Sequence, residues 1–181
     1  MEDATCVDDT LALYRRLRAA GHENVGIVLQ AYLKRTLHDI ADLREIRPSV
    51  RLCKGIYVES ASIAFRDADV VRRSFVASLD ALLEGGSRVA IATHDEALIT
   101  ASLERVAGVS PDAHAAGYEL QMLLGVRERR ATELVQAGHP LRVYVPYGRR
   151  WYEYSLRRLQ ENPQMAGVIA KATMARAVGR G

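Results

Sequence analysis

Val50-Arg-Leu-Cys-Lys-Gly-Ile-Tyr57 is followed by a stretch near Val70–Leu83 that closes on Gly85-Gly86, and then by Arg88-Val-Ala-Ile-Ala-Thr93. The first and last of these segments are short apolar runs typical of buried strands, and the segment between them has helical periodicity. A strand, a helix and a second strand in this order predict two parallel strands joined by a crossover helix.

The same alternation extends in both directions along the chain. Further strands are predicted at Val25–Gln30, Tyr118–Leu123 and Leu141–Val145. The predicted helices are one that ends at Gly21, one from about Leu33 to Leu43, one that follows a capping Asp95 and runs to about Val106, one through Val135 capped by Gly138, and one at Trp151–Leu159. No low-complexity linker interrupts the pattern. We therefore expect a single α/β domain over residues 1–181 with about five parallel strands and alternating helices.

Two folds fit this alternation, a doubly wound sheet and an incomplete (β/α)8 TIM-like barrel. Polar side chains lie at or just beyond the carboxyl end of every predicted strand, as Gln30, Lys54, Tyr57, Thr93-His94-Asp95, Gln121 and Tyr144–Tyr147. Barrel enzymes place their chemistry at this end, and contributions from all five strands suit a barrel mouth better than a single crevice. The Gly-rich fingerprints of the common nucleotide-binding folds are absent. We therefore favour the incomplete barrel.

The composition of the chain excludes several other classes of protein. With 181 residues, 49% hydrophobic and 26% charged, it is an ordinary globular protein with enough length for a good core. Its net charge of +3 and dispersed arginines do not indicate a nucleic-acid partner. Two cysteines, Cys6 and Cys53, provide neither a disulfide framework nor metal-ligand spacing. No apolar run is long enough to cross a bilayer, and the acidic start is not a signal peptide.

Five segments, in order, resemble successive motifs of proline dehydrogenase: 50–57, Ala92-Thr-His-Asp95, Tyr118–Gly125, Val143-Tyr-Val-Pro-Tyr-Gly148 and Trp151–Pro163. The similarity covers residues 24–163 and leaves 164–181 as a tail. The resemblance implies a flavoprotein on a distorted (β/α)8 barrel that oxidises L-proline to Δ1-pyrroline-5-carboxylate, reduces FAD and passes electrons to membrane quinone.

The resemblance also implies roles for residues at the strand ends. Arg51 would lie beside the reactive nitrogen of the flavin as the catalytic cation, and the other cofactor-binding residues would be Gln30, Lys54, Gly55, Ile56, Thr93, His94 and Gln121. Gly55 would permit a close approach of the backbone. The family usually has alanine where Ile56 stands. Without the resemblance, Arg51 is equally well explained by an ion pair with a neighbouring strand, and Gln30 and His94 by ordinary structural roles.

The substrate carboxylate would be clamped by Arg157 and Arg158, with Tyr154 against the proline ring, Tyr144 on the strand below and Glu161 holding Arg157 from behind. Tyr154 precedes the two arginines by three and four residues, so all three can share one side of a helix. The alternative is a solvated ladder of Glu153, Arg157 and Glu161 on an exposed helix.

In the family, strands before the first one predicted here complete the barrel, so we expect the chain to be the carboxy-terminal part of a catalytic domain. It would then be poorly stable, oligomeric or dependent on a complementing segment, because two sheet edges would be open. The expected location is cytoplasmic, with peripheral contact with the inner membrane through the tail as a weaker option. The alternatives are a non-catalytic remnant that acts only by association, or another flavin-dependent barrel oxidoreductase.

Overall fold

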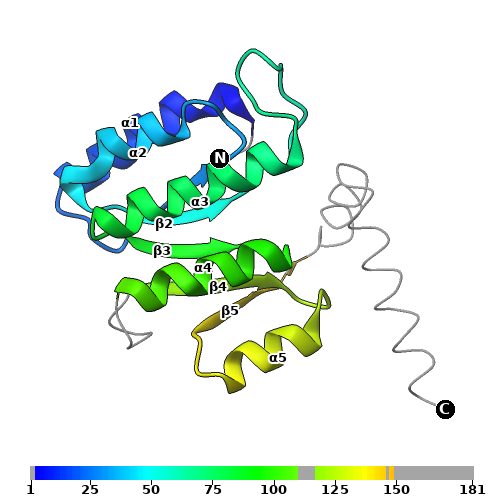
Figure 1. Ribbon diagram of the computed structural model, residues 1–181. Coiled ribbons are helices and arrows are strands. Elements are labelled where there is room, and N and C mark those ends of the chain that lie inside the picture. Colours follow the sequence, from blue (N-terminus) through cyan, green and yellow to red (C-terminus); the bar gives the residue numbers. More distant parts are fainter. Residues whose placement is uncertain (1–2, 110–116, 146, 149–181) are drawn as a thin grey trace. The chain divides into compact units, whose positions relative to one another are not determined.

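The computed structural model describes residues 3–109, 117–145, 147 and 148 and shows strands alternating with helices along this part of the chain (Figure 1). The elements are η1 (Ala4–Cys6), α1 (Val7–Ala19), β1 (Ile27–Gln30), α2 (Thr36–Leu43), η2 (Arg44–Ile46), β2 (Ser49–Cys53), α3 (Ala68–Glu84), β3 (Arg88–Ala92), α4 (Glu96–Val109), β4 (Tyr118–Leu123), α5 (Glu128–Gln136) and β5 (Leu141–Tyr144). Hydrogen bonding orders the strands β1-β2-β3-β4-β5 in one sheet. The predicted α/β fold of five parallel strands with alternating helices is confirmed.

The chain divides into two compact units, Met1–Leu120 and Gln121–Gly181, with the boundary inside β4. In the first unit β1, β2 and β3 are parallel and in level register. Cys53 is opposite Gln30 on one side and Ala92 on the other, and Arg51 is likewise opposite Val28 and Ala90. The carboxyl ends of these three strands therefore lie side by side. The prediction of one domain for the whole chain stays a prediction.

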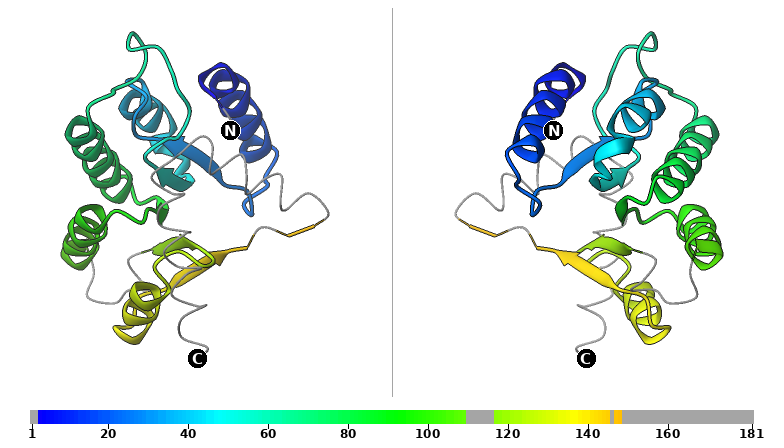
Figure 2. Two further views of the ribbon diagram at one scale, coloured as in Figure 1. Left: turned by 90° about the vertical axis from the view of Figure 1, so that its right-hand side faces the viewer. Right: turned by 90° about the vertical axis from the view of Figure 1, so that its left-hand side faces the viewer.

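One face of this sheet carries the core of the first unit. Val50, Leu52, Val89 and Ile91 are at most 1% exposed, and α3 contributes side chains buried to the same degree, including Phe75. The helices α3 and α4 lie beside each other along the sheet (Figure 2). Because side chains alternate between the two faces of a strand, the residues between these buried ones lie on the other face.

The second strand ends earlier than the sequence predicts. β2 stops at Cys53, so the predicted extension to Tyr57 is wrong. The cause is Gly55, whose φ of +106° takes the backbone out of the extended conformation. Residues 54–67 then form a loop, and Asp67 ends it by accepting the backbone N–H groups of Asp69 and Val70 at the start of α3.

Two glycines end helices as predicted. Gly21, with φ of +85°, donates its N–H to the carbonyl of Arg18 after α1, and Gly138, with φ of +88°, donates to Val135 after α5. In the second unit the N–H of Leu124 donates to the carbonyl of Tyr144 at 3.0 Å, and Leu134 of α5 is 1% exposed. The predicted helix at Trp151–Leu159 lies outside the described residues. None of the helices described has the length and apolar character to cross a membrane.

Candidate functional site

The level ends of β1, β2 and β3 bring two of the predicted cofactor residues onto one face of the sheet. Arg51 is two residues before Cys53, and Cys53 is opposite Gln30, so the side chains of Arg51 and Gln30 emerge on the same face. Between and beside them are Val28, Ala90 and Ala92, which are aliphatic or small. The result is an apolar row of side chains with an amide and a guanidinium within it.

Arg51 is exposed in this structure, in contrast to its buried strand neighbours Val50 and Leu52. Its side chain therefore lies on the face opposite the one that carries the core of the first unit, and whether it pairs with a neighbouring strand or with a flavin stays a prediction. Its positive charge still acts locally. Burial raises the pKa of the Cys53 thiol, and the guanidinium of Arg51 lowers it in part.

Immediately beyond the strands, Lys54 belongs to a network of charges. Its Nζ lies 3.1 Å from Oδ2 of Asp95, and the same oxygen accepts from Nε of Arg72 at 2.9 Å. Burial alone would raise the pKa of Asp95, but the hydrogen bonds from Arg72 and Lys54 outweigh it and hold the pKa below its usual value. The Asp95 side chain is only 11% exposed.

Asp95 and Arg72 are residues whose role the sequence did not reveal. Asp95 does stand directly before α4, as a capping residue should, but its carboxylate also links β2, β3 and α3. The sequence marked Asp95 as a helix cap, a strand-end residue and part of a motif, but none of these signals indicated its ion pairs with Lys54 and Arg72. Nothing in the sequence distinguished Arg72 from its neighbour Arg73, since this depends on how α3 is rotated against the sheet.

Thr93 and His94 lie between β3 and this carboxylate. Thr93 is 6% exposed, and its Oγ1 accepts the backbone N–H of Asp95 at 3.1 Å, which fixes the turn out of the strand. His94 is half-buried. The structure thus places both residues at the carboxyl edge, and their contact with a flavin stays a prediction.

Gly55 makes its close approach to a side chain of the protein itself. A Cβ on Gly55 would lie 2.6 Å from Cγ of Tyr32 and closer still to two other ring atoms. Tyr32 is held there because its N–H donates to the carbonyl of Lys54 and its carbonyl accepts from Phe65, both at 2.8 Å. On this side of Gly55 the space that was expected to admit a cofactor is filled by the Tyr32 ring. Ile56, the departure from the family pattern, is half-buried.

The remaining predicted site residues lie elsewhere. Gln121 is half-buried and Tyr144 is 44% exposed, both in the second unit. Tyr154, Arg157, Arg158 and Glu161 lie outside the described residues, so the substrate clamp stays a prediction. The structure therefore brings together the residues of the first unit: Gln30, Arg51, Lys54, Gly55, Ile56, Thr93 and His94.

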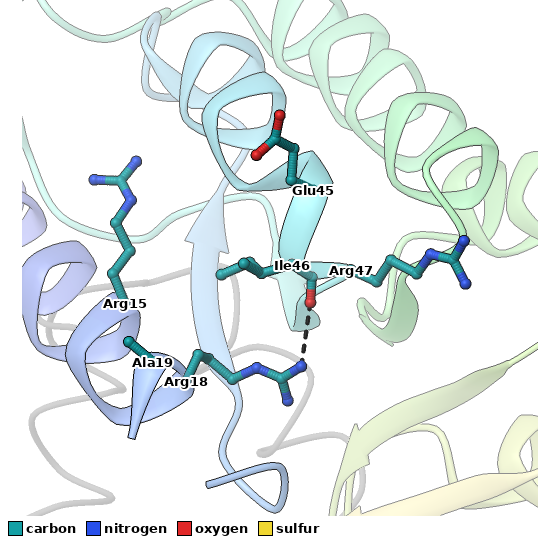
Figure 3. Close-up of a pocket in the computed structure, with 6 residues that line it drawn as sticks. All are labelled: Arg15, Arg18, Ala19, Glu45, Ile46 and Arg47. Carbon is teal, nitrogen blue, oxygen red and sulfur yellow. Dashed lines mark hydrogen bonds between the residues drawn. The ribbon is translucent and has the colours of Figure 1, made fainter. Parts of the chain in front are cut away.

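A hollow of about 360 Å³ is found near the opposite end of these strands, between the end of α1 and the turn before β2 (Figure 3). Its arginines point in different directions (Figure 3), and Arg18 is already bonded to the carbonyl of Ile46 at 3.2 Å. Arg15 lies 3.8 Å from Asp42. These guanidiniums do not converge on a common point, so we do not assign the site here. The lining residues are Arg15, Arg18, Ala19, Glu45, Ile46 and Arg47.

Comparison with known proteins identifies the family. The family model described as proline dehydrogenase matches residues 1–171. The chain belongs to the proline dehydrogenase family. Proline dehydrogenase 1 of Bacillus subtilis (strain 168) is 38% identical over 174 residues, covering 96% of this chain. Proline dehydrogenase of Deinococcus radiodurans is 40% identical over 177 residues, again covering 96% of this chain.

Among solved structures, proline utilization A of Bdellovibrio bacteriovorus, inactivated by N-propargylglycine, superposes with a TM-score of 0.76 at 25% identity over 88% of this chain and 19% of its own. Proline utilization A with proline bound in remote sites gives 0.73 at 26% identity, over 92% of this chain and 19% of its own. The chain spans 57% and 56% of the two proline dehydrogenases named above. The chain is therefore a member of the family, but it matches little more than half of a whole proline dehydrogenase. The activity of the whole enzyme is a proposal for this chain.

Proposed function

We propose that this chain carries the flavin-binding strand ends of an enzyme that oxidises L-proline to Δ1-pyrroline-5-carboxylate with FAD and passes the electrons to a quinone. The observation that carries the proposal is the face shared by Gln30, at the carboxyl end of β1, and Arg51, two residues before the end of β2, in a chain of the proline dehydrogenase family. Barrel enzymes bind their substrates and cofactors at this edge.

The residues present fit FAD. A flat aromatic ring system needs an apolar surface, which Val28, Ala90 and Ala92 provide beside Arg51. Its polar edges and its phosphates need hydrogen-bond donors, and Gln30, Arg51 and Lys54 are all donors. Because Arg51 is exposed, a ligand can reach its guanidinium without displacing a side chain from the core.

The roles of these residues follow from their charge and position. Bound FAD would supply the acceptor for the two electrons that leave proline. Arg51 would stabilise the negative charge that builds up beside it on reduction, since a fixed cation on a partly dehydrated face costs no rearrangement at that moment. Gln30, at 4% exposure, would orient the ring through its amide.

Substrate binding would fall to residues later in the chain. Arg157 and Arg158 would hold the proline carboxylate, with Tyr154 and Tyr144 against its ring and Glu161 positioning Arg157. Two guanidiniums match a carboxylate by charge and by geometry. A quinone acceptor, self-association and a cytoplasmic location with peripheral membrane contact belong to the same proposal.

The experiment is a spectrum of the purified chain with FAD, followed by addition of L-proline and an artificial electron acceptor. A bound flavin whose visible absorbance bleaches with proline supports the proposal. Arg51→Gln should slow this bleaching by about 100-fold. The matched control is Arg88→Gln, which removes the same charge from a side chain 66% exposed at the amino end of β3, and it should change nothing.

Absence of flavin binding together with absence of proline-dependent dye reduction would end the proposal. A colourless chain that only associates with copies of itself would support the non-catalytic remnant instead. Equal rates of flavin bleaching for Arg51→Gln and the unsubstituted chain would show that Arg51 does not stabilise the reduced flavin, although the chain is active.

A further inference from the structure

Four charged side chains form a cluster beyond the ends of β2 and β3: Lys54, Asp69, Arg72 and Asp95. Asp95 is its centre, because its Oδ2 accepts both Nζ of Lys54 at 3.1 Å and Nε of Arg72 at 2.9 Å. Arg72 also contacts Asp69, three residues earlier on α3, with its Nη1 2.7 Å from Oδ1 of Asp69. Two positive and two negative charges balance within the cluster.

The members of the cluster are not bound equally. Asp95 has two cationic partners, and Arg72 has two carboxylate partners. Within the described part of the chain, the Lys54 ammonium has Asp95 as its one ion-pair partner. The Lys54 side chain is 42% exposed, whereas that of Asp95 is 11% exposed. Lysine carries its charge on a flexible stem, so Lys54 is the member that can leave.

The consequence of its leaving depends on Arg72. A carboxylate as buried as Asp95 is costly to leave without a cation. With Arg72 in place, Asp95 keeps a charged hydrogen bond at 2.9 Å after Lys54 has turned away. Without Arg72, Lys54 would be the remaining cation on Asp95 within the cluster, and a ligand would have to compete with the carboxylate for it.

We propose that Lys54 is a releasable cation, which turns from Asp95 to a phosphate-bearing ligand, and that Arg72 is the positioning residue that makes this release possible. With FAD as the ligand, the inference rests on the proposed function. Arg72 acts through Asp95 and Lys54 and need not touch the ligand itself.

The experiment compares the affinity of the chain for FAD and for riboflavin, which lacks phosphate, by quenching of flavin fluorescence. Arg72→Gln should weaken FAD binding about tenfold. In this variant, moving Lys54 to the ligand leaves the buried Asp95 carboxylate without a cation, and this cost reduces the free energy of binding. Riboflavin binding should stay unchanged. Arg72→Lys, which keeps a cation beside Asp95, should recover part of the loss. The matched control Arg73→Gln changes the adjacent, exposed arginine and should leave both affinities unchanged.

A double mutant of Arg72 and Lys54 tests whether Arg72 acts through Lys54 or only supports the fold. Lys54→Met should weaken FAD binding by itself, and adding Arg72→Gln to it should produce no further loss. Additive losses, or an equal loss with riboflavin, would mean that Arg72 supports the fold and does not govern Lys54. Thermal unfolding of each variant shows whether the fold is retained.

A cofactor-free arm distinguishes this inference from the proposed function. The NMR signal of the Lys54 ammonium is followed while sodium pyrophosphate is added to the chain. The signal should shift with pyrophosphate, and Arg72→Gln should require about ten times more of it. If FAD does not bind but this difference is found, the flavin function fails and the release stands. If Lys54 responds identically with and without Arg72, the release is refuted.

Discussion

Replacing Gly55 by alanine should destabilise the protein far more than the same replacement at another glycine with positive φ. Gly55 has φ of +106°, and the Cβ of an alanine would overlap the Tyr32 ring, 2.6 Å from Cγ. Gly21 is the matched control, because its φ of +85° is similarly unfavourable while nothing lies within 4 Å of its Cβ position.

The magnitudes follow from separating the two effects. Forcing an L-residue into a left-handed conformation costs about 1–2 kcal/mol, and this should be the whole loss for Gly21→Ala. Overpacking a well-filled site adds about 1–3 kcal/mol. The Tyr32 ring cannot give way easily, because the residue is 7% exposed and both its backbone groups are hydrogen-bonded. We expect Gly55→Ala to lose roughly 2 kcal/mol more than Gly21→Ala.

The assay is urea unfolding followed by circular dichroism, with the slope of the transition compared among variants so that the difference reports stability. In a Tyr32→Ala background, Gly55→Ala should cost only the backbone part. Equal losses at Gly55 and Gly21, within about 0.5 kcal/mol, would show that the Tyr32 ring does not press on Gly55.

Three further predictions concern buried or paired polar groups. The Tyr32 hydroxyl is buried with no hydrogen-bond partner among the residues described, and burial first, then the charge of Glu59, raises its pKa to about 12. The unfolded chain ionises at Tyr32 first, so this residue should lower stability by up to about 3 kcal/mol as pH rises from 10 towards 12. Tyr32→Phe should make the fall smaller in urea titrations across that range, while burial of Tyr118, which also raises its pKa, should leave part of it in place. Asp95→Asn should lower stability by about 1–2 kcal/mol at neutral pH. Because the pKa of Asp95 is lowered, that stabilisation is present above its unfolded value of 3.8 and lost on further acidification, so thermal melts of the two proteins should converge in acid. Arg35→Gln removes the cation whose Nε lies 2.9 Å from Oδ2 of Asp39, a residue that is 3% exposed. The free energy of unfolding, measured by calorimetry, should fall by about 2 kcal/mol. The loss should be smaller in acid, because burial raises the pKa of Asp39 and its carboxylate is protonated at a higher pH than usual.

The elements of the fold were predictable where a local pattern determines them. The strand at Arg88–Ala92 alternates exposed and buried residues beside a helix-covered face, and the sequence located it to within one residue. The end of β2 was not predictable, because Ile56 and Tyr57 continue an apolar run that looks like strand. The backbone leaves the extended conformation at Gly55, and the Tyr32 ring fills the position that a Cβ there would occupy. This contact spans 23 positions of the chain, so no local pattern records it.

The candidate site shows the same division. Gln30 and Thr93 follow from the rule that polar residues gather at the carboxyl ends of parallel strands, and the register shows that β1, β2 and β3 end together. The role of Arg51, in the middle of β2, was given only by the resemblance. The charge cluster does not follow from any such rule. Arg72 and Arg73 are equivalent in the sequence, and only the rotation of α3 places Arg72 on Asp95.

The exposure of Arg51 limits what can cover this face of the sheet. Arg51 is exposed among the residues that the structure describes, so its guanidinium is accessible to water there. Any group that covers Val28, Ala90 and Ala92 also removes water from Arg51, and removing water from a cation is costly unless the group supplies negative charge or acceptors. A purely apolar occupant would therefore bind this face less well than one that supplies such groups. A flat ring with an edge that accepts hydrogen bonds, and that becomes more negative on reduction, would be held more tightly as its charge increases.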